Sequence, residues 1–207
     1  RGSGFHNDKG RRPHRDLNIL NYVPAIKEIT SRGGWVVRMG DNSMKPLPSM
    51  KNVIDYPFTK FKSEFMDLCL IQNCRFFIGT QSGLIEFAKL ASKNVLLTNI
   101  YNQMNMHGWG ILQHLYSQKD KRYLSIKELL LMDLKIKNFS SGALRTGLSD
   151  DNYVYTENNE EEILKAVLEY MNYLTSNNFS LTSKQKEYNE YRKKQGYRLL
   201  FERSKRL

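Results

Sequence analysis

Short apolar segments alternate with helical patterns between residues 17 and 98, and this alternation constrains the fold more than any other feature of the chain. Helices are predicted over residues 17–32, 63–73 and 82–92, and strands over residues 35–40, 53–56, 75–79 and 94–98. Nearly all-apolar strands that alternate with helices are typical of a parallel sheet that is covered on both faces. The sequence therefore predicts an α/β fold built on a doubly wound parallel sheet.

The second half of the chain is less regular. Residues 160–174 have the clearest helical pattern, because their apolar side chains recur at helical spacing along one face. A short helix is predicted over residues 125–133, a loop over residues 138–158 and a basic helix over residues 184–207. No element is predicted within residues 100–120, which match neither pattern clearly.

Positive charge gathers at the two ends of the chain. The 207 residues carry a net charge of +11, and 40% of them are hydrophobic, which is enough for a sizeable core. Residues 1–16 and 176–207 supply most of the excess charge. We expect one folded domain over residues 1–175, truncated at its start. A basic helical segment over residues 176–207 would pack back on this fold or on a missing N-terminal domain.

The composition favours a cytoplasmic protein. No apolar run approaches the roughly 18 residues of a membrane helix, and no signal peptide is visible. Cys69 and Cys74 match neither a disulfide framework nor a zinc site, so buried, reduced thiols are expected. The basic C-terminal helix is expected to be solvated, or to contact a partner domain or the anionic surface of the inner membrane.

A polar turn follows the strand predicted over residues 75–79. Thr80, Gln81, Ser82 and Gly83 separate this strand from the next helix. Ligands of doubly wound sheets bind at the carboxyl ends of the strands, and free N–H groups at a helix N-terminus attract anions. The hydroxyls of Thr80 and Ser82 add donors, and Gly83 lets a phosphate approach the backbone. The turn therefore predicts an anion site, with an ordinary Ser82 helix cap as the alternative.

Two other residues favour the anion site. Asp67 stands fifteen residues before Ser82, in the early turns of the preceding helix. A carboxylate there either complements the helix dipole or accepts hydrogen bonds from a ribose or a base. Arg1 leads a Gly-Ser-Gly segment, and its guanidinium suits a diphosphate, which it can bind through two parallel hydrogen bonds.

The segment from Asp67 to Ser82, DLCLIQNCRFFIGTQS, resembles the donor-binding motif of the α-1,6-fucosyltransferase and bacterial nodulation fucosyltransferase group. In that group an Asp on a helix contacts the nucleotide, and a Thr-x-Ser turn holds the diphosphate. The resemblance implies these roles for Asp67, Thr80 and Ser82. The group also has a His-x-Arg motif whose Arg binds the β-phosphate, and Arg1 is the candidate for that Arg.

A closer resemblance covers roughly residues 1–116. The segments GGWVVRMGDNSMKPL, VIDYP, SEFMDLCL and RFFIGTQSGL are similar to a family of bacterial glycosyltransferases found with surface-polysaccharide genes. This resemblance implies a GT-B architecture. The chain would then be the Rossmann-like, C-terminal donor-binding half, with the acceptor-binding N-terminal domain absent or incomplete.

The GT-B resemblance implies that no metal or other cofactor is needed, and that the nucleotide-sugar is the donor substrate. Basic residues and helix N-termini stabilise the leaving diphosphate in such enzymes. The sequence agrees with this expectation. No two of its aspartates stand two residues apart, as the Asp-x-Asp motif of metal-dependent GT-A enzymes requires.

Other polar residues remain as candidates. Arg38 ends an apolar strand, so it needs a carboxylate or a phosphate as partner, and Asp41 and Asp55 are the carboxylates nearest to it in sequence. Asp41 is also a candidate to contact the sugar or the acceptor. His6, Asp8 and Asp41 are the candidates for a catalytic base. Solvated loop positions are the alternative for His6 and Asp8.

The sequence thus predicts an inverting, metal-independent glycosyltransferase that transfers a sugar from a nucleotide-sugar to a surface-polysaccharide or other glycan acceptor. A pyruvyl or other group transferase acting on polysaccharide is one alternative, and it would prefer a non-nucleotide anion. A non-enzymatic basic module is the other alternative. No nucleic-acid partner is expected, because the sequence lacks an RNA-binding motif with interleaved aromatic residues.

Overall fold

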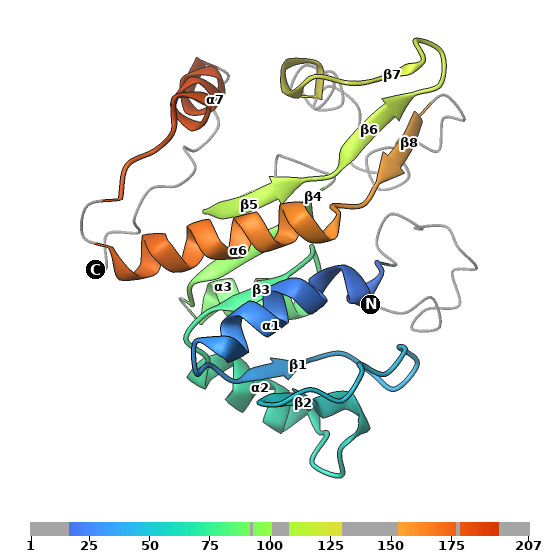
Figure 1. Ribbon diagram of the computed structural model, residues 1–207, viewed down its shortest axis with the longest axis vertical. Helices are drawn as coiled ribbons and strands as arrows, with labels where there is room; N and C mark the ends of the chain where they lie inside the picture. Colours follow the sequence, from blue (N-terminus) through green and yellow to red (C-terminus); the bar gives the residue numbers. More distant parts are fainter. Residues whose placement is uncertain (1–16, 92, 101–107, 130–152, 177–178, 195–207) are drawn as a thin grey trace.

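A computed structural model of the protein describes residues 17–91, 93–100, 108–129, 153–176 and 179–194 (Figure 1). The elements up to residue 100 follow the predicted order of helix, strand, strand, helix, strand, helix and strand. They are η2 (Ile19–Tyr22), α1 (Val23–Ser31), β1 (Val36–Arg38), β2 (Val53–Asp55), η3 (Tyr56–Phe58), α2 (Glu64–Asn73), β3 (Phe77–Gly79), α3 (Gly83–Leu90) and β4 (Val95–Ile100).

The later part of the chain combines strands with two further helices. They are β5 (Trp109–Leu112), β6 (His114–Ser117), β7 (Arg122–Tyr123), β8 (Tyr153–Thr156), α6 (Glu160–Thr175) and α7 (Ser183–Lys194). The predicted helix over residues 160–174 is confirmed as α6. The prediction of a loop over residues 138–158 is wrong where β8 lies. The β-branched and aromatic residues of β8 pair with β6 and form a strand. Residues 138–152 and 195–207 of these predictions lie outside the described residues.

The strands form parallel and antiparallel sheets. β1 pairs with β2 in parallel, and β3, β4 and β5 form a parallel sheet in that order. The predicted parallel pairing is therefore confirmed, although the parallel strands form two separate hydrogen-bonded sheets rather than one. β7, β6 and β8 form an antiparallel sheet that the sequence did not predict. The protein is a mixed α/β fold with parallel sheets, which is compatible with a Rossmann-like arrangement.

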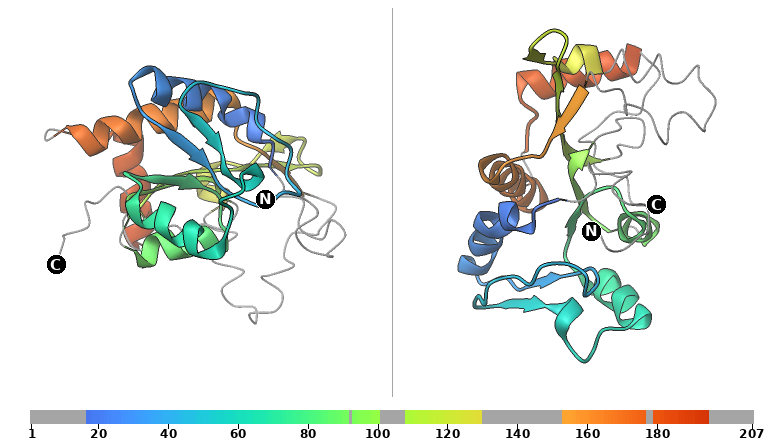
Figure 2. Two further views of the ribbon diagram at one scale, coloured as in Figure 1. Left: turned by 90° about the horizontal axis from the view of Figure 1, so that it is seen from below. Right: turned by 90° about the vertical axis from the view of Figure 1, so that its right-hand side faces the viewer.

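β4 lies at the centre of the core and is buried along its whole length. Val95, Leu97 and Ile100 pack against α2 and α3, whereas Leu96 packs against α1, β5 and α6. Figure 2 shows this layering, with α1 and α6 on one face of the strands and α2 and α3 on the other. Because successive side chains of a strand point to opposite faces, covering both faces buries every residue of β4.

Local capping fixes where the helices begin. Ser63 caps α2 as predicted, since its hydroxyl accepts a hydrogen bond from the Met66 N–H. Asn159 and Glu162 form a capping box at the start of α6, in which each side chain accepts a hydrogen bond from the other residue's backbone. The first turns of both helices are therefore held in place.

The basic helix α7 contacts the rest of the fold through part of its surface. Tyr188 packs against the cluster that contains Ile71 and Ile85. Arg192 is only 1% exposed, and its guanidinium lies 5.8 Å from the centre of the Tyr188 ring. Among the described helices, none is long and apolar enough to cross a membrane.

Candidate functional site

The polar turn predicted as an anion site lies between β3 and α3. It follows the carboxyl end of β3, which is the edge where ligands of parallel α/β sheets bind. α2 precedes β3 and packs against α3. Because a helix connecting parallel strands runs back across the sheet, the first turn of α2 lies toward the same edge as the first turn of α3. The topology therefore directs Asp67 and the turn to one edge.

The turn leaves the start of α3 open. Ser82 occupies the N-cap position in an extended conformation, but its side chain makes no capping hydrogen bond within the described residues. Gly83 is exposed, and a Cβ placed on it would meet nothing within 4 Å. Within the described residues the alternative of a Ser82 cap bond is therefore not formed, so the Ser82 side chain does not occupy the first N–H groups of α3.

Thr80 and Gln81 are more enclosed than Gly83. The Thr80 hydroxyl oxygen is buried and has no hydrogen-bond partner in the described part of the chain. Gln81 is buried, with 7% of its surface exposed. Buried hydroxyl groups in proteins are normally satisfied, so the unpaired Thr80 oxygen indicates a place where an additional polar group can bind.

Asp67 has one paired and one unpaired carboxylate oxygen. Its side chain is 15% exposed, and its Oδ2 atom forms an ion pair with the Lys62 ammonium. Its Oδ1 atom is buried and has no hydrogen-bond partner among the described residues. An unpaired buried carboxylate oxygen is costly, which makes Oδ1 a candidate acceptor for a ligand donor.

Sequence reasoning missed Lys62. Its ammonium lies 5.2 Å from the centre of the Tyr56 ring, and the Tyr56 hydroxyl accepts a hydrogen bond from the Ser63 N–H. These contacts hold Lys62 beside the start of α2. The only signal in the sequence was a lysine directly before the N-cap Ser63, five residues before Asp67.

Arg38 is held by a protein partner. Its Nη1 donates a 2.8 Å hydrogen bond to Asp55 Oδ1, and its Nη2 donates a 2.5 Å bond to the Lys45 carbonyl oxygen. The parallel register places Arg38 directly opposite Asp55. Burial lowers the pKa of Arg38, and the charges of Asp55 and Asp41 oppose that shift. Of the two predicted carboxylate partners, Asp55 makes the direct contact.

Asp41 supports its own turn. Its Oδ1 accepts a 2.9 Å hydrogen bond from the Ser43 N–H and a second bond from the Ser43 hydroxyl. The side chain therefore closes the loop after β1. Arg1, His6 and Asp8, the other predicted site residues, lie outside the described residues.

A buried polar junction at the carboxyl end of β4 was also missed. Asn99 and Asn158 exchange two 2.7 Å hydrogen bonds, each from the backbone N–H of one residue to the side-chain oxygen of the other. Asn158 Nδ2 donates a 2.6 Å bond to the Leu112 carbonyl. The Tyr22 hydroxyl lies 2.6 Å from the Thr98 hydroxyl and accepts from Asn99 Nδ2 at 3.3 Å. These contacts fix the ends of β4 and β5 against η2 and against Asn158, two residues before the start of α6.

Burial raises the pKa of Tyr22 within this junction, although its hydrogen bonds with Thr98 and Asn99 act in the opposite direction. Tyr22 therefore remains a neutral phenol and can serve as both donor and acceptor. Asn99 adopts φ +52°, a conformation that asparagine tolerates better than most residues.

Comparisons with protein-family models, curated proteins and solved structures found no match. The geometry of the carboxyl edge therefore carries the functional argument, together with the sequence resemblance.

The described residues contain no group of three or more His, Cys, Asp or Glu residues that could hold a metal ion. Cys69 and Cys74 are free thiols and partly buried rather than fully buried as predicted. Burial raises the pKa of Cys74, which favours its unreactive thiol form.

Proposed function

We propose that the protein is a glycosyltransferase that takes a sugar from a nucleotide-sugar and transfers it to a surface-polysaccharide or other glycan acceptor. The observation that carries this proposal is a pair of buried oxygens, Asp67 Oδ1 and Thr80 Oγ1, which have no hydrogen-bond partner among the described residues. The topology directs both toward the edge where α3 begins. A ligand satisfies both oxygens if it donates a hydrogen bond to Asp67 Oδ1 and presents an anion to the Thr80 hydroxyl. A nucleoside diphosphate has both kinds of group.

Each residue has a distinct role in this proposal. Asp67 accepts hydrogen bonds from the ribose or the base. The Thr80 and Ser82 hydroxyls and the Gly83 N–H donate to the diphosphate, and the dipole of α3 favours its negative charge. These roles agree with those implied by the resemblance of the Asp67–Ser82 segment to the fucosyltransferase donor motif.

Lys62 adds a positive charge to the same edge. In the absence of a ligand its ammonium neutralises Asp67. A ribose hydroxyl that binds Asp67 at Oδ1 leaves the ion pair at Oδ2 in place, so the Lys62 ammonium stays beside the bound nucleotide. Stabilising the diphosphate lowers the barrier for its departure from the sugar, so the transfer is proposed to need no metal. An inverting transfer, as predicted from the sequence, is part of the same proposal.

Asp67→Asn tests the nucleotide site. A hydrogen bond to a charged group contributes about 1.5–3 kcal/mol, so losing the charge is expected to weaken nucleoside diphosphate binding by at least about tenfold. Calorimetry with ADP, GDP, UDP and CDP in the presence of EDTA measures the affinity. Glu64→Gln is the matched control, because Glu64 is an exposed acid in the same helical turn.

Binding of one nucleotide by the wild type and the control, but not by Asp67→Asn, supports the proposal. If none of the four nucleotides binds the wild-type chain, the proposed nucleotide site is wrong. Binding of phosphoenolpyruvate alone would favour the pyruvyl transferase instead.

A further inference from the structure

The antiparallel sheet carries an open cavity that is separate from the nucleotide site. This cavity has a volume of about 370 Å³ and is lined by Tyr116, Gln118, Lys121, Tyr123, Val154 and Thr156. Its volume is at the lower end of the range of about 300–1,000 Å³ that is common for small-molecule sites. The strand register explains how these residues meet. Tyr116 of β6 stands opposite Tyr123 of β7 and Val154 of β8.

The two tyrosines offer aromatic surfaces at a large angle to each other. Their ring centres are 5.3 Å apart and the planes are inclined at 75°. Tyr123 is 54% exposed, and its ring also has an edge contact with His114. A solvent-exposed aromatic ring beside polar groups is a common element of binding sites, because it buries apolar area without losing much side-chain entropy.

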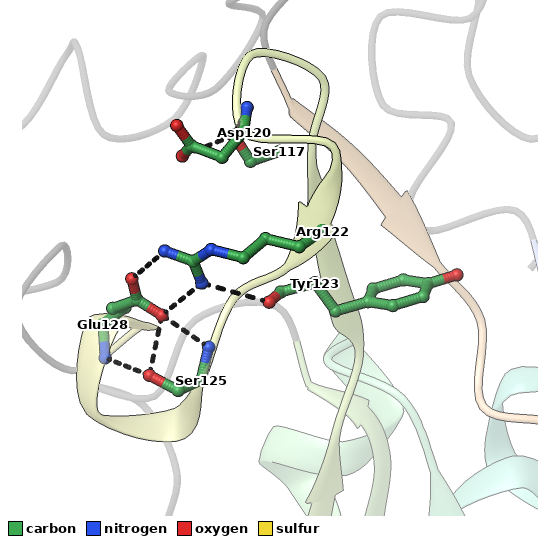
Figure 3. A network of polar contacts seen from close by, with 6 residues as sticks. All are labelled: Ser117, Asp120, Arg122, Tyr123, Ser125 and Glu128. Atoms are coloured by element: carbon green, nitrogen blue, oxygen red, sulfur yellow. Dashed lines mark hydrogen bonds and ion pairs between the residues drawn. The ribbon is translucent and has the colours of Figure 1, made fainter.

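Polar contacts on the other side of β7 hold Tyr123 in position. Arg122 donates from Nη1 and Nη2 to the two carboxylate oxygens of Glu128, at 2.9 and 2.6 Å. Glu128 also accepts from the backbone N–H and the hydroxyl of Ser125. In Figure 3 the Arg122 side chain points toward Glu128, and the Tyr123 ring points the opposite way. Arg122 thus links β7 to the segment that contains Glu128, and Tyr123 points away from this contact.

The Arg122 network is favoured electrostatically. The hydrogen bond from Arg122, followed by those from Ser125, holds the pKa of Glu128 well below its usual value. Glu128 is therefore an anion at neutral pH and keeps both contacts with Arg122.

The lining of the cavity suits a carbohydrate. The C–H bonds of a sugar ring are weakly positive and pack against the negative face of an aromatic ring. Gln118, Lys121 and Thr156 provide the donors and acceptors that sugar hydroxyls need. Among the described lining residues, Lys121 is the single cationic one. The described lining therefore offers less to a polyanion than to a neutral chain of sugar units.

We propose that this tyrosine-lined cavity binds sugar units of the glycan acceptor at some distance from the end that reacts. The assignment of the glycan as an acceptor rests on the proposed function. β6 begins two residues after β5 ends, so the antiparallel sheet extends from the carboxyl edge of the parallel strands (Figure 1). A polysaccharide whose end reaches the nucleotide-sugar at that edge can extend along this sheet.

Tyr123→Ala tests the cavity. The probes are maltotetraose, cellotetraose, isomaltotetraose and chitotetraose, and saturation-transfer NMR of the full chain reports their binding. We expect at least one of them to bind, and Tyr123→Ala to weaken that binding by about tenfold, as for other exposed aromatic anchors. Tyr123→Phe should retain binding because it keeps the ring. Ile126→Ala is the matched control, since Ile126 is also 54% exposed but lies outside the lining.

The possible outcomes distinguish a failure of the glycan site from a failure of the proposed function. Oligosaccharide binding that survives in Asp67→Asn, but not in Tyr123→Ala, supports a separate glycan site. If oligosaccharides bind and nucleotides do not, the cavity is supported as a glycan site. The proposed function is then wrong, and so is the interpretation of the glycan as its acceptor. Absence of binding by all four oligosaccharides, or equal binding by Tyr123→Ala and the wild type, overturns the inference.

Discussion

Asp55→Ala is expected to lower the free energy of unfolding by about 3–5 kcal/mol, because it leaves the buried Arg38 guanidinium without its counter-charge. The Arg38 side chain is 4% exposed and that of Asp55 is 20% exposed. Asp55 Oδ2 also accepts a 2.7 Å hydrogen bond from the Leu47 N–H, so the same substitution leaves a second donor unpaired. Urea unfolding followed by circular dichroism measures the loss.

Two further variants identify the cause. Glu161→Ala removes an ion pair with Lys165 in which both side chains are more than 70% exposed, and it should change stability little. Arg38→Met combined with Asp55→Leu removes both charges and should be less destabilising than Asp55→Ala alone. If Asp55→Ala lowers the free energy of unfolding as little as Glu161→Ala does, the buried ion pair does not stabilise the fold as proposed.

Asn158→Ala is the second substitution for which we expect a large loss of stability. It removes the partner of the buried Asn99 N–H and of the partly buried Leu112 carbonyl oxygen, at the ends of neighbouring strands. Each unsatisfied group costs about 1–3 kcal/mol. The free energy of unfolding should therefore fall by several times the effect of an average surface substitution.

Hydrogen exchange of the Asn99 amide gives a local measurement for the same variant. This amide should lose protection in Asn158→Ala, because its hydrogen-bond acceptor is removed. Asn172→Ala is the control, since Asn172 is an exposed residue of α6. Equal stability of the two variants would contradict the role assigned to the polar junction.

The first half of the fold and helix α6 could be predicted from the sequence because their signals are local. The Ser63 cap of α2, the apolar run of β4 and the helical spacing of α6 each identify an element without reference to the rest of the chain. Parallel pairing followed from strands that are apolar on both faces. Asp67 and the turn after β3 were likewise predicted as candidates from their positions relative to those elements.

Other features depend on partners that are distant in sequence. β8 consists of four residues, and it is a strand because it pairs with β6, some forty residues earlier. The bonds between Asn99 and Asn158 join residues 59 positions apart, and neither side chain has a local signal for burial. The ion pair of Lys62 with Asp67 was missed for a different reason, because the loop before α2 had no predicted geometry.

The polar junction also determines which shortened forms of the chain can fold. A fragment that ends before residue 158 leaves the Asn99 amide without its acceptor, and it lacks Ile163, Ala166, Val167 and Tyr170, the α6 side chains that cover one face of β4. During synthesis, the strands and helices of the first 100 residues therefore emerge well before the segment that completes their core. Until α6 leaves the ribosome, that face of the nascent sheet is exposed to water and to other proteins, which makes it a natural point of contact for a chaperone.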